Sequence, residues 1–180
     1  MSKRALIVID LQNDYYPGGK WTLPDIESAT DNAVRLLAAA RKSGDKVVHI
    51  QHRAPAGAPF FVDGSEGMAI NERVQPQGDE PVVVKEYANS FRETNLKAIL
   101  DDAGITDLVI CGAMSNNCVD AATRAAADFG YVCTVVHDAC AASPLEFGGR
   151  KISAAEVHGS FMAALGFAYG KLLSTDEYLS

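Results

Sequence analysis

Residues 107–130 read DLVICGAMSNNCVDAATRAAADFG, and this stretch decides the fold. It begins with a short apolar run, residues 108–111, that has the length and composition of a buried strand. The run breaks at Gly112. From Cys118 onward, apolar residues recur at steps of three and four, which predicts a helix that ends near Gly130. Cys118 is therefore expected in the first turn of a helix that follows a buried strand.

A thiol in that position has two interpretations. Unpaired backbone N–H groups and the helix dipole favour a thiolate at a helix start, which indicates a reactive group. A buried structural cysteine is the alternative, although it would be expected inside an apolar run and not on a turn. We favour the reactive thiol.

The alternation of strand and helix patterns continues on both sides of this stretch. Strands are predicted at residues 4–10, 46–51, 82–84, 131–136 and near 168–173, and helices at 25–43, 93–103 and 153–165. Residues 11–24, 52–81 and 138–151 are predicted loops. This alternation predicts an α/β fold with a parallel sheet and helices on both faces. A length of 180 residues without repeats or linkers predicts one domain over residues 1–180.

Three chemically active side chains are expected just beyond the carboxyl ends of predicted strands, where parallel sheets bind ligands. Asp10 ends the first strand, Lys85 ends the third, and Cys118 follows the fourth. A cysteine nucleophile needs a proton acceptor and a positive neighbour, and these roles suit Asp10 and Lys85. Taken singly, Asp10 could instead cap a helix or bind loop amides, and Lys85 could be a solvated strand-end lysine. Their joint placement favours a functional site.

Composition narrows the class of protein. A hydrophobic content of 48% and a charged content of 22% are typical of soluble globular proteins. The net charge of −7, with scattered acidic residues, argues against nucleic acid as a partner. No stretch is long enough to cross a bilayer, and the N-terminal apolar run is too short for a signal peptide. The four cysteines lack CxxC pairing, which predicts reduced thiols in a cytoplasmic protein.

Three segments closely resemble the isochorismatase-like cysteine hydrolases, a superfamily that includes nicotinamidases, carbamoylsarcosine amidohydrolases and ureidoacrylate amidohydrolases. They are ALIVIDLQNDYYPGG (5–19), VVKEYANSF (83–91) and ICGAMSNNCVDAATRAAADFGYVCTVVHDACA (110–141). The resemblance runs through nearly the whole chain in the same order and spacing. It implies a three-layer, doubly wound fold with a central six-stranded, mainly parallel sheet flanked by helices on both faces.

The resemblance also implies roles for single residues. It implies a catalytic triad of Asp10, Lys85 and Cys118, and a cis peptide at Ala113–Met114. The backbone N–H groups of Met114 and Cys118 would form an oxyanion hole. Together with the chemistry of these groups, this predicts a cysteine-dependent amidohydrolase that cleaves a C–N bond of a small amide, carbamoyl or ureido compound. Cys118 would form a thioester with the substrate while Asp10 accepts the thiol proton.

Two other interpretations stay open. An isochorismatase-type hydrolase would cleave a vinyl ether or an ester, but siderophore-type isochorismatases lack the nucleophilic cysteine that is present here as Cys118. A non-catalytic or redox-sensing protein would use Cys118 only as an oxidisable thiol. Such a sensor needs no aspartate beside its thiol, so the presence of Asp10 favours the hydrolase.

A metal ion is not expected. Nicotinamidases of this superfamily carry a metal site whose ligands include an Asp-x-His after the second strand, and here that place reads Gln51-His52-Arg53. We therefore predict no metal and no other cofactor, and structural or substrate-contact roles for His49 and His52.

The expected partner is a small-molecule substrate. Its pocket is predicted to include Asn117 beside the nucleophile, and Tyr16, Trp21 and Phe60 from the loops beyond the strands. No nucleic acid or membrane partner is expected. The resemblance also implies assembly as a homodimer or homotetramer.

Overall fold

The chain folds around a six-stranded sheet in a computed structural model that describes residues 3–180. The strand order is β3-β2-β1-β4-β5-β8, and all neighbouring strands pair in parallel. The strands are β1 (Arg4–Ile9), β2 (Lys46–His52), β3 (Val82–Lys85), β4 (Asp107–Ala113), β5 (Val132–Ala141) and β8 (Lys171–Leu173). The α-helices are α1 (Ile26–Ser43), α2 (Leu96–Asp102), α3 (Asp120–Asp128), α4 (Ala154–Ala168) and α5 (Thr175–Leu179). The predicted doubly wound α/β fold is confirmed, with every strand of the six-stranded sheet parallel.

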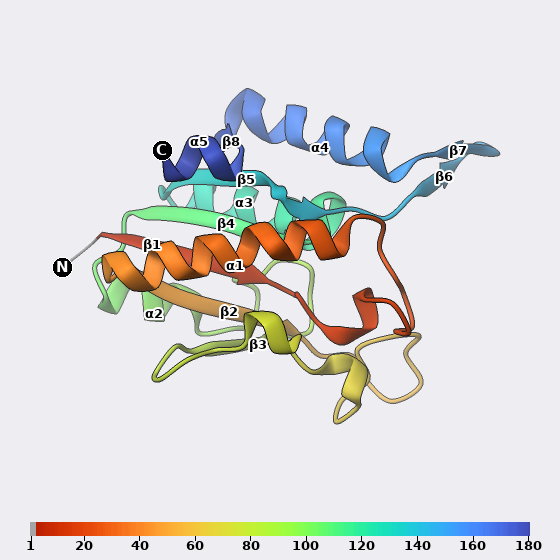
Figure 1. Ribbon diagram of the computed structural model, residues 1–180, viewed down its shortest axis with the longest axis horizontal. Coiled ribbons are helices and arrows are strands. Elements are labelled where there is room, and N and C mark those ends of the chain that lie inside the picture. The colour runs from red at the N-terminus through yellow and green to blue at the C-terminus, as the bar shows by residue number, and fades with distance from the viewer. Residues whose placement is uncertain (1–2) are drawn as a thin grey trace.

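Helices cover both faces of this sheet (Figure 1). Successive side chains of β1 enter two different cores. Leu6 and Val8 pack in the core beneath α1, whereas Ile7 and Ile9 pack in the core shared with α2, α3 and α4. Because both faces are buried, β1 is apolar almost throughout, which is the pattern of a central parallel strand.

β5 is longer than predicted. The sequence predicted its end at Val136 and a loop over residues 138–151, but the strand continues to Ala141. Asp138 conceals the extension, because a carboxylate is unusual inside a buried strand. Its Oδ1 accepts hydrogen bonds of 2.8 and 2.7 Å from the backbone N–H and the hydroxyl of Thr175, at the start of α5. This partner comes from the far end of the chain.

The last part of the chain also differs from the prediction. The predicted loop contains β6 (Leu145–Phe147) and β7 (Arg150–Ile152), which form an antiparallel hairpin that projects from the body (Figure 1). Each strand has only three residues, all exposed except the half-buried Ile152, so neither is long enough to give a strand pattern in the sequence. α4 continues to Ala168, so the final strand begins only at Lys171, and α5 follows it. α2 begins at Leu96, later than predicted.

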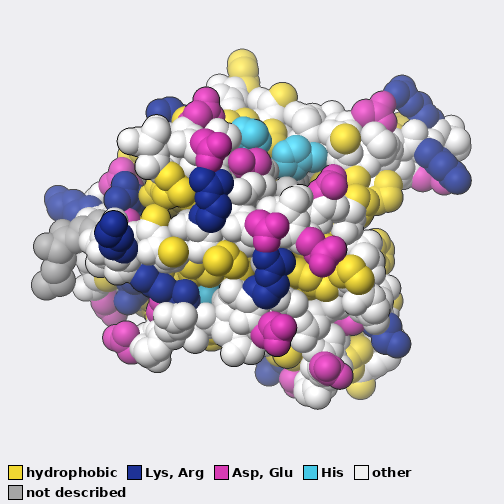
Figure 2. All heavy atoms as spheres, in the orientation of Figure 1, with side chains coloured by type: hydrophobic (Ala, Val, Ile, Leu, Met, Phe, Trp, Pro, Cys, Tyr) yellow, Lys and Arg dark blue, Asp and Glu magenta, His cyan; other side chains and the backbone are white. Residues whose placement is uncertain are grey.

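The distribution of surface charge and the lengths of the helices relate to two kinds of partner, nucleic acid and membrane. On the face that Figure 2 shows, Lys and Arg side chains are interspersed with Asp and Glu. Among the described residues on this face there is no continuous basic surface of the kind that phosphate binding requires. Within residues 3–180, no helix combines the length and the apolar character that crossing a bilayer would require.

Gly112 sets how closely β4 approaches β1. Its φ is +124°, and a Cβ at this position would lie 2.0 Å from the carbonyl oxygen of Ile9. We expect Gly112→Ala to lower the free energy of unfolding by at least about 2 kcal/mol, because backbone atoms have to move. Gly159→Ala in α4 is the control, since a Cβ there meets nothing within 4 Å, and it should be neutral or slightly stabilising. Urea denaturation compares the two variants, and equal stability would contradict this prediction.

Candidate active site

Asp10, Lys85 and Cys118 converge at the carboxyl edge of the sheet. Asp10 follows β1, Lys85 ends β3, and Cys118 lies in a π-helical turn (η4, Ser115–Val119) that joins β4 to α3. Lys85 Nζ lies 2.7 Å from Asp10 Oδ2 and 3.2 Å from Cys118 Sγ. The exposed fractions of Asp10, Lys85 and Cys118 are 0, 1 and 2%. The predicted convergence of the three groups is confirmed.

The backbone is irregular where it carries these groups. Asp10 has a φ of +50°, in the left-handed region that aspartate tolerates better than most residues. Non-glycine residues held in this region concentrate at functional sites. The peptide between Ala113 and Met114, just before the π-helical turn, is cis, as predicted.

The surroundings of Lys85 favour its ammonium form. Burial alone would lower the pKa of Lys85. The charge of Asp10, together with the hydrogen bonds to Asp10 and Cys118, outweighs burial and raises this pKa above its ordinary value. Lys85 is therefore a buried cation paired with the Asp10 carboxylate.

The surroundings of Cys118 favour its neutral thiol. Burial, and then the Asp10 carboxylate, raise the pKa of Cys118 above its ordinary value, and Lys85 offsets only part of this rise. This corrects the expectation that the helix start would hold a thiolate. Asp10 Oδ1 is buried and has no hydrogen-bond partner within residues 3–180, and a carboxylate oxygen of Asp10 lies within 4.8 Å of the sulfur. An unpaired carboxylate oxygen beside a neutral thiol is suited to accept its proton.

His52 completes the group around Lys85. It is the register partner of Lys85 in the β2–β3 pair, and its Nδ1 lies 3.0 Å from Lys85 Nζ. Donor atoms of Asp10, His52 and Cys118 lie within 4.8 Å of one another, a spacing that metal ligands also show. Lys85 Nζ already contacts all three residues, and its positive charge would repel a metal cation. The donor set fits the lysine ammonium better than a metal ion.

His49 lies in a different environment. Its Nε2 is 3.0 Å from Glu80 Oε2, and Arg41 pairs with the same carboxylate at 2.7 Å. Glu80 precedes β3 and Arg41 belongs to α1, so these contacts join three segments of the fold. They give His49 a structural environment away from the triad.

Ser115 anchors the turn that carries Cys118. Its hydroxyl is buried, 3.2 Å from the Ala141 carbonyl oxygen in β5 and 2.8 Å from His158 Nδ1 in α4. We expect Ser115→Ala to lower the free energy of unfolding by about 1–3 kcal/mol, because buried polar partners are left unpaired. Ser90→Ala is the matched control. Ser90 is equally buried, but its hydroxyl has no partner within the described residues. Ser90→Ala should therefore leave the free energy of unfolding unchanged or raise it, as measured by urea denaturation. A larger loss in Ser90→Ala would contradict this account.

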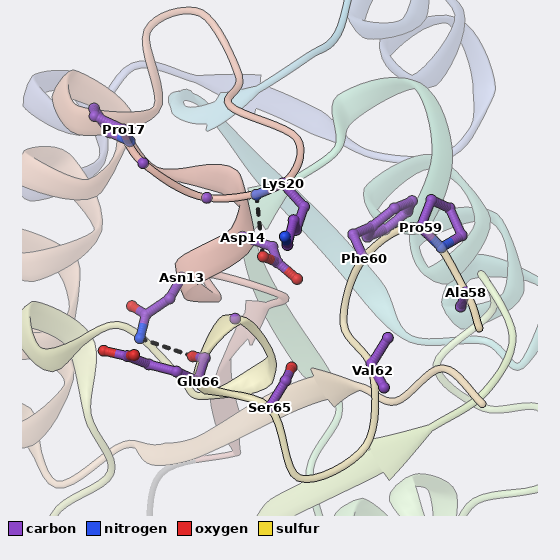
Figure 3. A pocket seen from close by; sticks show the side chains of 13 residues that line it. Asn13, Asp14, Pro17, Lys20, Ala58, Pro59, Phe60, Val62, Ser65 and Glu66 are labelled. Atoms are coloured by element: carbon purple, nitrogen blue, oxygen red, sulfur yellow. Dashed lines mark hydrogen bonds between the residues drawn. The ribbon is translucent and has the colours of Figure 1, made fainter. Parts of the chain in front are cut away.

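A cavity of about 560 Å³ opens between the loop after β1 and the loop after β2 (Figure 3). Its lining comes from residues 13–20 and 58–67. Asp14 joins these two loops, because its carboxylate accepts hydrogen bonds from the backbone N–H groups of Lys20 at 3.1 Å and Phe61 at 2.6 Å. The shape of the cavity therefore depends on Asp14.

The four predicted pocket residues lie in different surroundings. Phe60 lines this cavity. The Trp21 ring packs against the Phe60 ring, with the two ring centroids 5.0 Å apart. The Tyr16 hydroxyl lies 2.6 Å from Thr30 Oγ1 in α1, so this side chain packs in the core beneath α1. Asn117 is exposed on the π-helical turn. Substrate contact by these residues stays a prediction.

Tyr15, a further aromatic residue of the loop after β1, lies close to the triad. It is 1% exposed, and burial together with the charge of Asp10 raises its pKa. Its ring packs edge-on against Phe61, with centroids 4.6 Å apart. The sequence gives two adjacent tyrosines, and only the path of the loop decides which of them lies close to the triad.

These features define a class: an α/β protein with a buried Asp–Lys–Cys group at the carboxyl edge of its parallel sheet. The isochorismatase domain model matches residues 4–162, and the chain belongs to the isochorismatase family.

Relatives of known sequence or structure agree with this assignment. The uncharacterized isochorismatase family protein YddQ of Bacillus subtilis is 44% identical over 176 residues, which cover 97% of this chain and 98% of that protein. The maleamate amidohydrolase of Pseudomonas putida is 34% identical over 151 residues, 76% of this chain and 71% of that protein. The crystal structure of an isochorismatase hydrolase from Oleispira antarctica has a TM-score of 0.95 at 49% identity, covering 98% of this chain and 95% of that chain.

Proposed function

We propose that the protein is a cysteine-dependent amidohydrolase that cleaves a C–N bond of a small amide, carbamoyl or ureido compound. The observation that carries this proposal is the buried group in which Lys85 contacts both Asp10 and Cys118, while Asp10 Oδ1 has no hydrogen-bond partner among residues 3–180. A cysteine nucleophile needs these parts: a thiol, a base for its proton and a fixed positive charge. The similarity to a maleamate amidohydrolase supports an amide as substrate.

In the first half of the proposed reaction, Cys118 Sγ attacks the substrate carbonyl carbon while Asp10 takes the thiol proton. The C–N bond then breaks, and Asp10 gives the proton to the leaving ammonia or amine. The acyl group stays on Cys118 as a thioester. In the second half, Asp10 takes a proton from a water whose oxygen attacks the thioester, and the proton returns to the departing sulfur. Lys85 stays protonated throughout and holds the carboxylate.

The backbone N–H groups of Met114 and Cys118 are the proposed donors to the oxyanion of the tetrahedral intermediate. Met114 directly precedes the π-helical turn, and Cys118 lies within it. Backbone donors of this kind cost nothing to reorganise during the reaction, and each contributes roughly 3 kcal/mol to transition-state stabilisation in comparable enzymes.

A panel of primary amides, N-carbamoyl compounds and ureido acids, assayed for ammonia release, tests the proposal. With a substrate that is turned over, acid quenching and intact-mass measurement should show one acyl adduct, which peptide mapping assigns to Cys118. Failure to turn over any member of the panel, or turnover with the adduct on another cysteine, would contradict the proposal. Cleavage of a vinyl ether or an ester alone would favour an isochorismatase-type hydrolase.

The pH dependence of alkylation separates the hydrolase from a redox sensor. Because burial and Asp10 raise the pKa of Cys118, we expect iodoacetamide to label it slowly at neutral pH and faster as the pH rises. Rapid labelling that does not change with pH, without turnover of any amide, would favour the sensor.

We also propose a homodimer or homotetramer. Phe167 on α4 and Phe147 on the β6–β7 hairpin are 91 and 83% exposed, and contact with another copy of the chain would remove this apolar surface from water. Light scattering during size-exclusion chromatography should give a mass above that of one 19.2 kDa chain. Phe167→Ser should shift the assembly towards the monomer. A monomeric wild-type protein would contradict this prediction.

A cytoplasmic location and a single domain over residues 1–180 complete the proposal. All four cysteines are free, which suits a reducing compartment. The sheet takes strands from both ends of the chain, β1 and β8, which supports one cooperative unit.

A further inference from the structure

We propose that His52 is a positioning residue for Lys85: its Nδ1 accepts a hydrogen bond from the ammonium and keeps that ammonium beside Cys118. An ammonium has three N–H groups, and within the described part of the chain three acceptors surround Lys85 Nζ. They are Asp10 Oδ2 at 2.7 Å, His52 Nδ1 at 3.0 Å and Cys118 Sγ at 3.2 Å. The inference rests on the proposed function in one respect, namely that Lys85 serves the Cys118 nucleophile.

The backbone of His52 is itself fixed by a buried side chain. Gln12 Oε1 accepts a hydrogen bond of 2.7 Å from the His52 N–H, and Gln12 Nε2 donates one of 2.8 Å to the His52 carbonyl oxygen. Gln12 lies two residues after Asp10, so one short segment holds both the carboxylate and the histidine. Register pairing of His52 with Lys85 then puts their side chains on the same side of the sheet.

The contact with Lys85 dictates the tautomer of His52. An ammonium offers no acceptor, so Nδ1 must be unprotonated and Nε2 must carry the ring hydrogen. Burial, and then the charge of Lys85, lower the pKa of His52, while Asp10 and Glu86 oppose this change. The buried group thus holds one negative charge, on Asp10, and one positive charge, on Lys85. Without the imidazole, one N–H of a buried ammonium is left unpaired, and the ammonium is free to turn away from the sulfur.

NMR of the ¹⁵N-labelled imidazole rings tests the tautomer and needs no substrate. At pH 7 we expect His52 as the Nε2–H tautomer with an accepting Nδ1, its signals identified by their loss in His52→Asn. In Lys85→Met, the Nδ1 signal should move towards that of a nitrogen without a donor. An Nδ1–H tautomer, an imidazolium, or an Nδ1 signal unchanged in Lys85→Met would overturn the proposal.

Two substitutions then separate positioning from packing. His52→Leu removes the acceptor, whereas His52→Asn keeps an amide oxygen near the place of Nδ1. We expect His52→Leu to lower kcat about 10- to 100-fold with a smaller change in KM, as is found when residues that support a functional group are removed at other sites. We expect His52→Asn to retain most of the wild-type kcat.

Alkylation of Cys118 at a fixed pH gives a readout that does not depend on turnover. It should slow in His52→Leu, because a displaced ammonium no longer lowers the thiol pKa, and recover in His52→Asn. Equal losses in both variants, or unchanged alkylation in a folded His52→Leu protein, would overturn the proposal. If the wild type hydrolyses no amide, the proposed function fails, and the tautomer and the alkylation rates still decide this inference.

Discussion

Cys118→Ala is expected to reduce kcat/KM about a thousandfold or more for any amide that the protein hydrolyses. Without the sulfur no thioester forms, and only substrate binding and the backbone donors remain to accelerate the reaction. Initial rates of ammonia release measure the loss. Full activity in Cys118→Ala would end the proposed mechanism.

Cys133→Ala is the matched control for this substitution. Cys133 is also buried, but the contacts of its thiol are the backbone carbonyl oxygens of Thr123 and Tyr131, far weaker partners than those of Cys118. Its removal should leave kcat/KM nearly unchanged. A loss in Cys133→Ala as large as that in Cys118→Ala would show that the assay reports folding and not the nucleophile.

Lys85→Met is expected to abolish turnover and to lower the free energy of unfolding by about 3–5 kcal/mol. The methionine is similar in volume, so the main effect is electrostatic: the Asp10 carboxylate stays at 0% exposure without its cation. Asp10→Asn should be destabilising for the converse reason, since it leaves the Lys85 ammonium uncompensated. Urea denaturation at pH 7 measures both effects.

The double variant Asp10→Asn/Lys85→Met provides the sharper test of this pair. With both charges removed, neither is left buried alone, so its loss of stability should be smaller than the sum of the two single losses. The double variant should still lack activity, because base and cation are both absent. Additive losses of stability would show that the two charges do not interact as the 2.7 Å contact indicates.

The sequence was most informative where short-range patterns are strong. The apolar run at β1 identified a central strand, because burial on both sheet faces leaves a continuous apolar sequence, and the helical spacing after Cys118 identified α3. Local sequence patterns mispredicted an element where the residue that stabilises it lies far away in the chain. Asp138 interrupts β5 in sequence, yet its partner Thr175 lies beyond α4, so no local reading could extend that strand.

The chemical identity of the triad was already present in the sequence, since Asp10, Lys85 and Cys118 each follow a strand pattern and parallel strands end at one edge. The protonation states of these groups could not be predicted from the sequence. A helix start predicted a thiolate, but burial and Asp10 favour the thiol, and burial exists only in the folded protein. The same holds for His52, whose register with Lys85 was not visible before β2 and β3 paired. The sequence by itself determined which groups this protein has and the edge at which they meet. The tertiary structure alone decided their distances, partners and charges, because these depend on contacts between segments as far apart as residues 10 and 85 and on the exclusion of water around them.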